Sequence, residues 1–334
     1  MSGKTSHWSK KRESGAYFSM LLGVSCYRLL GRRGAHVLLY PIIGYFFLRD
    51  ASARRASRDF LARSYQFAPR GESFFSKAPT RIDSFNHFMN FGRSIVDRIA
   101  SWTGDIQRED LVFRDRQHLL DCVASGRGGV ILSSHLGNAE MCRALLDKVA
   151  GVKMNVLVFN DNAAQINRMM KRLNPRVDLE LIQISGVTPG TAMVLNEKIS
   201  KGEFIVIAAD RTSSATPEKS IQVPFMGEMA SFPQGVFILA GLLACPVFLL
   251  FCLQKEEHHI YLEHFSDSMA MPRRKRAELL SQHIERYAQR LQHYALMAPL
   301  QWFNFFDFWA QQENGGSQTN NTPGLERSNE QLGA

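Results

Sequence analysis

Hydrophobic residues recur along this chain in two rhythms, and the change from one to the other divides it. Up to about residue 125 the apolar positions follow a helical spacing, which predicts helices over 80–102 and 114–124. Short apolar runs of strand type then begin, at 129–133, 154–159, 179–184 and 204–210, with helix-like segments between them. This alternation predicts βαβ units, and therefore an α/β fold with a mostly parallel central sheet flanked by helices.

The last third of the chain continues the pattern with longer elements. After a predicted loop over 223–229 come a helix over 234–243, a strand over 246–253 and an antiparallel partner strand over 258–265. A long charged helix then begins at Pro272 and extends to about Met297. We expect three regions, namely an N-terminal segment 1–63, an α/β domain 64–310 and a disordered tail 311–334.

The N-terminal segment combines apolar stretches with a concentration of positive charge. Residues 1–63 hold 12 basic and 3 acidic side chains, which equals the net charge of +9 of all 334 residues. Uncharged stretches at 15–27 and 37–48 are each shorter than an ordinary span of ~20 residues, and Arg28, Arg32 and Arg33 lie between them. We expect two helices at one membrane leaflet with these arginines at the headgroups, the alternative being a pair of buried helices in a soluble protein.

This basic end favours a polyanionic partner, which can be an anionic membrane surface, an acidic carrier protein or nucleic acid. The long apolar runs of this segment argue against nucleic acid as its partner. Five cysteines lie singly, without a C-x-x-C pair, and are expected to be reduced thiols of a cytosolic protein. No cleavable signal peptide is recognised.

Residues 130–140 carry the first chemical motif. An apolar run leads to His135, and Asn138 is a good cap for a helix that begins with Ala139 and Glu140. The histidine then lies at the carboxyl end of a strand, where open α/β sheets bind ligands. There it is placed to act as a general base on a hydroxyl or an amine, the alternative being a structural histidine in a turn.

A second apolar strand ends in Asp210 and Arg211, at the same edge of the predicted sheet. Either Glu140 or Asp210 can orient the imidazole of His135 and raise its basicity. Arg211 is suited to stabilise an oxyanion or to hold a phosphate. The alternative is a structural Asp–Arg pair that caps a strand.

The third motif, Val-Pro-Phe-Met-Gly at 223–227, is followed by Phe-Pro-Gln-Gly at 232–235. Gly227 and Gly235 permit close backbone approach, and Pro233 suits a helix start whose free N–H groups face an anion or a carbonyl oxygen. The alternative is a glycine-rich loop without a ligand. Across the three motifs the candidate substrate-binding residues are Gly137, Asn138, Phe225, Gly227, Pro233 and Gly235.

Several common catalytic motifs are missing from the sequence. G-x-S-x-G, G-x-G-x-x-G, the P-loop pattern and H-E-x-x-H do not occur. These absences argue against a serine hydrolase, a common dinucleotide or P-loop protein and a zincin. A base without a partnered nucleophile indicates direct attack by a bound acceptor.

Taken together, His135-Leu-Gly-Asn-Ala-Glu140, Asp210-Arg211 and Val223–Gly227 with Pro233 and Gly235 resemble the bacterial lysophospholipid acyltransferase superfamily. The branch is that of the lipid A biosynthesis (lauroyl/myristoyl) acyltransferase family and the phosphatidylinositol mannoside acyltransferase. The resemblance covers about residues 5–310. An N-terminus broken by arginines and a C-terminal run 299–309 with few Trp and Arg depart from the lipid A enzymes. The branch found with aryl-polyene or flexirubin-type lipid pathways resembles the chain better there.

The resemblance implies an acyltransferase that moves a fatty acyl chain from a thioester of acyl carrier protein or CoA to a lipid or glycolipid acceptor. His135 is the implied general base, with Glu140 or, preferably, Asp210 as its partner. Arg211 and backbone N–H groups near Gly137–Ala139 are the implied oxyanion donors. Neither a metal nor a cofactor is implied.

The implied location is the cytoplasmic face of the bacterial inner membrane, with peripheral, monotopic or N-terminally anchored attachment. The aromatic run Trp302–Trp309 can lie at the membrane interface, line the acyl channel or pack in the core. Two other functions stay open. They are a non-catalytic membrane-associated protein on an acyltransferase scaffold and a nucleotide-sugar glycosyltransferase, the latter suggested by the α/β pattern alone.

Overall fold

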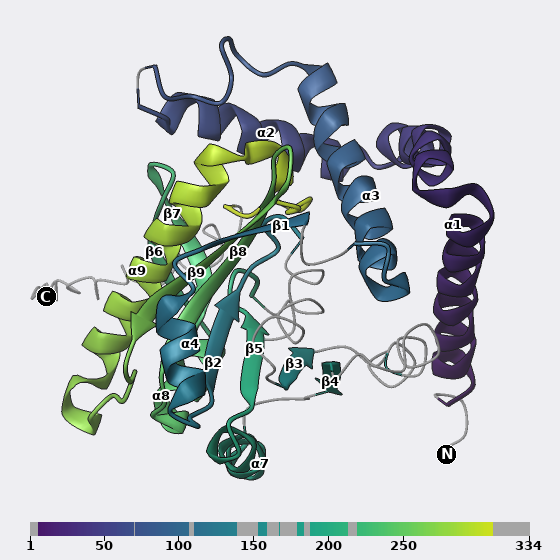
Figure 1. Ribbon diagram of the computed structural model, residues 1–334. Helices are drawn as coiled ribbons and strands as arrows, with labels where there is room; N and C mark the ends of the chain where they lie inside the picture. Colours follow the sequence, from purple (N-terminus) through teal and green to yellow (C-terminus); the bar gives the residue numbers. More distant parts are fainter. Residues whose placement is uncertain are drawn as a thin grey trace, which may run out of the picture.

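A computed structural model describes residues 6–69, 71–106, 110–138, 153–158, 167, 179–183, 188–212 and 219–309, with backbone alone at 6–22, 179–180 and 189. A seven-stranded sheet lies at the centre and helices flank it (Figure 1). The α/β class and the mostly parallel sheet predicted from the sequence are therefore confirmed.

The main sheet has the spatial order β1-β9-β8-β2-β5-β3-β4. Its strands are β1 (Leu111–Arg114), β2 (Gly129–Ser133), β3 (Met154–Val158), β4 (Leu179–Gln183), β5 (Phe204–Ala208), β8 (Val247–Gln254) and β9 (His258–Ser266). Neighbouring strands are parallel except for β8 and β9, which pair antiparallel as the sequence predicts.

The described helices are α1 (Ser6–Arg49), α2 (Ala51–Phe67), α3 (Arg81–Thr103), α4 (Gln117–Ala124), α7 (Pro189–Ser200), α8 (Gln234–Leu243) and α9 (Arg276–Met297). Their ends follow local chemistry. Thr80 and Asp83 form a capping box at the start of α3, and Gly104 in the left-handed conformation ends it. Two short 3₁₀ turns, Arg273–Lys275 and Pro299–Gln301, lie before and after α9.

Three of the described strands, β1 and the pair β6 and β7, differ from the sequence prediction. Strand β1 was not predicted, because it has four residues and only Leu111 is buried. The segment predicted as a loop over 223–229 is part of a separate hairpin, β6 (Ser220–Phe225) and β7 (Glu228–Pro233). Met226 and Gly227, both with positive φ, form its two-residue turn, and this turn chemistry was read as a loop.

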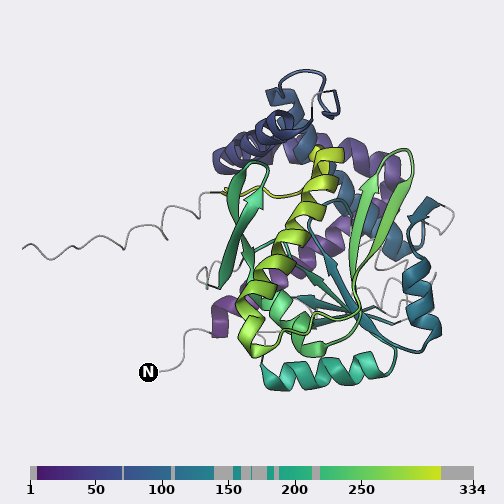
Figure 2. The ribbon, with the colours of Figure 1, turned by 90° about the vertical axis from the view of Figure 1, so that its left-hand side faces the viewer.

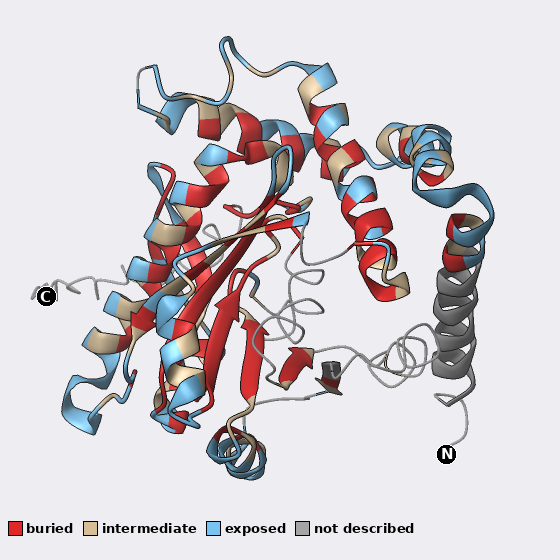
Figure 3. Ribbon diagram, in the orientation of Figure 1, coloured by how far each residue is buried: buried red, intermediate tan, exposed pale blue. Residues whose placement is uncertain are grey.

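The two faces of the sheet are buried under different layers, because alternate side chains of a strand point to opposite faces. Val130 and Leu132 of β2 belong to the core shared with α8, α9 and the hairpin, whereas Ile131 belongs to the core shared with α3 and α4. In Figure 2, α9 runs between the hairpin β6–β7 and strands β8 and β9. Figure 3 shows the central strands buried and the outer faces of the helices exposed.

Helix α1 contains both predicted N-terminal apolar stretches, and it is broken at Gly31, where φ is 65°. The part after the break packs on α3 at Gly92, where an added Cβ would lie 3.1 Å from Ile43 and 3.2 Å from Leu39. Within the described part of the chain, none of the helices has both the length and the hydropathy to cross a membrane.

Helix α2 extends across the predicted boundary between residues 63 and 64. Its Phe60 and Leu61 are buried in the main core, so the α/β unit includes a helix from the predicted N-terminal segment. The expected tail 311–334 lies outside the described residues.

The cysteines differ from the expectation at one position. Cys26, Cys122 and Cys245 are free, whereas Cys252 is disulfide-bonded, so the prediction of reduced thiols throughout is wrong there. Cys142 lies outside the described residues.

Candidate active site

The candidate site begins with the pairing of two central strands. Strands β2 and β5 are parallel neighbours, with Ser133 opposite Ala208, and the N–H of Ala209 continues the ladder to the carbonyl of Ser133. His135 and Asp210 each lie two residues beyond this last pair. The register therefore brings a histidine and an aspartate side by side at the carboxyl edge of the sheet, where ligands bind in open α/β folds.

Asp210 holds His135 at two points. The ring Nδ1 of His135 lies 2.8 Å from Oδ1 of Asp210, and the backbone N–H of His135 donates to Oδ2 at 2.9 Å. An ionised carboxylate only accepts hydrogen bonds, so Nδ1 carries a proton, and in the neutral imidazole Nε2 keeps a lone pair. No described residue bonds to Nε2, and the His135 side chain is 35% exposed, whereas Asp210 is 0% exposed. The basic nitrogen is thus left accessible.

The environment of Asp210 keeps it ionised. Burial alone raises the pKa of this carboxyl, but the charge and hydrogen bonds of His135, together with the charge of Arg211, outweigh it and lower the pKa to about 2. An ionised partner fixes the tautomer of His135 and stabilises the imidazolium that forms when Nε2 takes a proton.

A third residue, which the sequence motifs did not include, donates to the same carboxylate. The indole Nε1 of Trp302 lies 3.0 Å from Oδ2 of Asp210, and the Trp302 side chain is fully buried. The backbone carbonyl of Trp302 accepts a hydrogen bond from Nε2 of His87 at 2.9 Å, while Nδ1 of His87 accepts from the hydroxyl of Ser57. The only sequence signal was a tryptophan in an apolar run.

The backbone after His135 is tied to two other segments. Leu136 pairs with Trp302 in an isolated bridge, and the N–H of Phe303 donates to the carbonyl of His135. The N–H groups of Gly137 and Asn138 donate to the carbonyls of Gln301 and Cys252. The expectation that these two N–H groups stabilise an oxyanion is therefore wrong, because carbonyl oxygens already accept from them. Ala139 and Glu140 lie outside the described residues.

Arg211 lies at the rim of the site beside Asp210. Its Nη2 donates to the carbonyl of Phe303 at 2.6 Å, and the guanidinium lies 5.8 Å from the centre of the Phe306 ring. Burial of this guanidinium lowers the pKa of Arg211, and the charge of Asp210 partly offsets this. The guanidinium stays charged in either case and has N–H groups left for a developing anion.

The other candidate binding residues lie in two places. Gly137 and the 6% exposed Asn138 line a cavity next to the His135 loop. Phe225 is buried, with its ring centre 5.3 Å from that of Trp302, so it supports the site from the core. Gly227 lies in the hairpin turn near Phe67.

Pro233 and Gly235 lie at the start of α8, where the N–H of Gln234 donates to the carbonyl of Lys219. No described contact joins Gly227, Pro233 or Gly235 to His135. The expected grouping of the third motif with the histidine is therefore not seen among the described contacts.

The C-terminal aromatic run packs mainly in the core. Trp302, Phe303, Phe308 and Trp309 are all buried, and Phe306 is 37% exposed. Of the three readings of this run, core packing is the one that the burial supports.

In the described part of the chain, no group of three or more His, Cys, Asp or Glu side chains is arranged to hold a metal ion. The site combines the imidazole of His135, the buried carboxylate of Asp210 and the guanidinium of Arg211. These groups lie together at the carboxyl edge of the sheet of an α/β protein.

Comparison with known families identifies the chain more closely. The family of bacterial lipid A biosynthesis acyltransferases matches residues 86–311, about two thirds of the 334 residues. The chain belongs to this family, and the resemblance stated from its motifs is confirmed at that level. The protein is accordingly an acyltransferase. No curated protein matches the chain.

Proposed function

We propose that the protein transfers a fatty acyl chain from a thioester, on acyl carrier protein or CoA, to a hydroxyl or an amine of a lipid or glycolipid. The observation that carries the proposal is the contact between His135 and Asp210, because it leaves Nε2 as an accessible base. The membership of the acyltransferase family supplies the reaction class. The branch found with aryl-polyene or flexirubin-type pathways stays a prediction.

The reaction follows from the positions of these groups. Nε2 of His135 takes the proton of the acceptor as the acceptor oxygen or nitrogen attacks the thioester carbonyl carbon. Asp210 stabilises the resulting imidazolium, and Arg211 stabilises the negative charge on the carbonyl oxygen. When the carbon–sulfur bond breaks, the sulfur leaves as a thiolate and takes the proton from Nε2. The products are the acylated acceptor and a free thiol, and no acyl-enzyme forms.

The test is acyl transfer by purified protein supplied with radiolabelled acyl thioester and a total lipid extract. We expect the H135A variant to lose transfer and thiol release together, because the base is removed. An H118A variant, which changes another histidine, on α4, serves as the control and should retain both. Undiminished turnover by H135A would refute the assigned role of His135. Failure of the native protein to consume thioester would favour the non-catalytic alternative.

We further propose that the protein binds the surface of an anionic membrane, at the cytoplasmic face of a bacterial inner membrane. Helix α1 supports this, since several large apolar side chains beyond the break at Gly31 are exposed, among them Val37 at 70%, Tyr45 at 56% and Leu48 at 78%. Arg28 and Arg33 are exposed on the same helix, whereas Arg32, the third arginine expected there, is ion-paired with the buried Asp97 of α3. Apolar side chains with arginines beside them suit insertion into one leaflet with the cations at the headgroups.

A further inference from the structure

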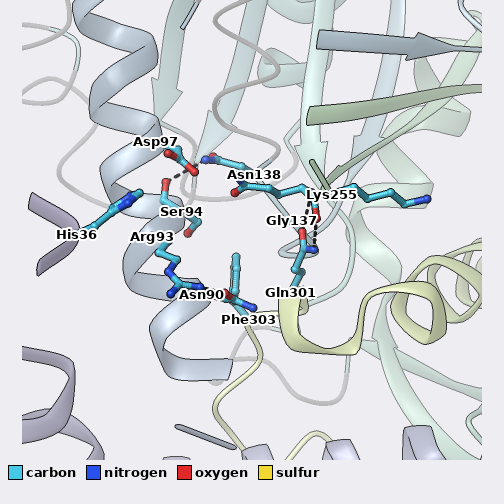
Figure 4. A pocket seen from close by; sticks show the side chains of 11 residues that line it. His36, Asn90, Arg93, Ser94, Asp97, Gly137, Asn138, Lys255, Gln301 and Phe303 are labelled. Atoms are coloured by element: carbon cyan, nitrogen blue, oxygen red, sulfur yellow. Dashed lines mark hydrogen bonds between the residues drawn. The ribbon is translucent and has the colours of Figure 1, made fainter. Parts of the chain in front are cut away.

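A cavity of about 250 Å³ lies next to the candidate active site, between α1, α3 and the loop after His135 (Figure 4). Its lining includes Gly137 and Asn138, two and three residues after His135, and Phe303, whose N–H donates to the carbonyl of His135. The cavity therefore shares a wall with the site, although His135 itself does not line it. A group bound in it would lie beside the backbone segment that follows His135.

Among the described residues that line the cavity, Arg93 is a cation without a carboxylate partner. Arg93 extends from α3, and its Nη1 donates to the amide oxygen of Asn90 at 3.2 Å. No carboxylate among the described residues pairs with this guanidinium. Asp97 also lines the cavity, but both Nε and Nη2 of Arg32 donate to its Oδ1, which compensates its charge. The lining thus has a net positive charge centred on Arg93.

His36 lines the cavity on the opposite side from the His135 loop. The ring of His36 on α1 points towards α3 in Figure 4, and its Nε2 is buried without a hydrogen-bond partner. Buried polar atoms are nearly always paired in folded proteins, so an unpaired ring nitrogen in a cavity wall indicates a ligand atom. Lys255 contributes no second cation, because its ammonium extends away from the other labelled side chains (Figure 4).

We infer that this cavity binds a phosphate group carried by one of the two substrates. The guanidinium of Arg93 offers a planar pair of N–H donors, and His36 offers a further ring nitrogen, a combination that suits phosphate oxygens. The inference rests on the proposed acyl transfer, since both candidate carriers are substrates of that reaction. One is the phosphate headgroup of an acceptor lipid, and the other is the phosphate of the pantetheine arm of the donor. The position beside the exposed apolar part of α1 favours the lipid headgroup.

The experiment is calorimetric titration of the full-length protein with inorganic phosphate. We expect the R93Q variant to bind phosphate about tenfold more weakly or worse, because one charge-assisted contact is lost. The matched control is R81Q, which removes an exposed arginine from the same helix but not from the cavity. An R93K variant should bind with intermediate affinity, since it keeps the charge and loses the planar fork. Absence of phosphate binding, or equal binding by R93Q and the native protein, would overturn the inference.

Two further titrations identify the carrier. If the lipid supplies the phosphate, water-soluble dihexanoyl phosphatidic acid should bind more tightly than dihexanoylglycerol, and R93Q should abolish the difference. If the donor supplies the phosphate, coenzyme A should bind more tightly than pantetheine, and R93Q should abolish this difference. If neither pair shows a difference that depends on Arg93, the inference is wrong. The H135A variant should bind phosphate like the native protein, so a failure of the proposed catalytic role and a failure of this site remain distinguishable.

Discussion

Trp302 donates its indole N–H to the same carboxylate oxygen of Asp210 that accepts the backbone N–H of His135. Both side chains are fully buried, so bulk water does not reach this hydrogen bond. The C-terminal aromatic run thus acts on the candidate base through the aspartate. Trp302 is a positioning residue, because its indole N–H bonds to Asp210 rather than to His135.

The first prediction follows from this contact. A W302F variant keeps an aromatic ring in the core but leaves Asp210 without one donor, which should reduce stability by about 1–3 kcal/mol and raise the pKa of Asp210. We expect transfer to fall about tenfold, with the low-pH limb of its pH profile displaced. The control is W309F, because Trp309 is also buried and its Nε1 donates to the carbonyl of Phe225. An unchanged profile in W302F would contradict the positioning role.

Replacing the aspartate itself should be more severe. In a D210N variant an uncharged amide no longer fixes the tautomer of His135 or stabilises its imidazolium, and we expect transfer to fall by roughly 10²–10⁴-fold. The measurement is initial rate at saturating thioester. A D267N variant is the matched control, because Asp267 makes the same type of contact to His264 at an exposed position. Similar rates for D210N and D267N would show that Asp210 does not assist the base.

Gly137 tests how closely the His135 loop approaches β8. Its φ is +68°, and an added Cβ would lie 1.6 Å from the carbonyl oxygen of Cys252. We expect G137A to lose about 3 kcal/mol or more of unfolding free energy, and transfer with it. Gly126 has a similar φ of +71° but open space around its Cβ position, so G126A should cost only about 1 kcal/mol. Urea denaturation compares the two, and equal losses would argue against the close approach.

The buried His87 predicts a stability change in mildly acidic solution. Burial lowers the pKa of His87 to about 4, against an ordinary value of 6.5, and the hydrogen bond to Trp302 opposes this only in part. Between pH 6.5 and pH 4, His87 is therefore protonated in the unfolded chain but not in the folded chain. This stabilising contribution is present above pH 6.5 and is lost as the pH falls towards 4, on the order of 3 kcal/mol.

The measurement is the urea unfolding free energy of the native protein and an H87Q variant between pH 7 and pH 4. At pH 7 the variant should be less stable than the native protein, because its hydrogen bonds change. Between pH 7 and pH 4, however, its unfolding free energy should fall by about 3 kcal/mol less than that of the native protein. Parallel curves would mean that His87 is not the group that titrates. Asp210 does not interfere, since its lowered pKa matters only below about pH 4.

The exposed apolar part of α1 predicts vesicle binding. A V37E/L48E variant should bind vesicles containing phosphatidylglycerol about tenfold more weakly or worse, because two apolar side chains become charged. The control is M193E, since Met193 on α7 is 75% exposed, close to the 78% of Leu48. Co-sedimentation measures both. Equal loss in the two variants, or no binding by the native protein, would contradict attachment through α1.

Much of the fold could be predicted because its strands are short apolar runs at regular spacing. The order of the strands in the sheet could not be predicted, because hydrophobic periodicity does not show that β5 lies between β2 and β3. That order decides the site, since it makes Asp210 the neighbour of His135. The sequence offered Glu140 and Asp210 equally on spacing, and the preference for Asp210 came from the family resemblance. Glu140 lies outside the described residues.

The remaining features depend on contacts between distant segments. Trp302 lies 92 residues after Asp210, and its apolar neighbours gave no sign that its N–H meets a carboxylate. The family resemblance implied that backbone N–H groups near Gly137–Ala139 stabilise an oxyanion. The carbonyls of Gln301 and Cys252 accept hydrogen bonds from those of Gly137 and Asn138 instead. No local sequence pattern predicts hydrogen bonds between segments so far apart in the chain.

The bridge between Leu136 and Trp302 also has a consequence for biosynthesis. Trp302 follows the described strands of the main sheet in the sequence, so a growing chain contains His135 and these strands before it contains the indole that donates to Asp210. Premature termination before residue 302 would leave most of the sheet intact and the aspartate without its indole donor. The hydrogen bond to Asp210 can therefore form only after Trp302 has been synthesised, whatever the state of the strands.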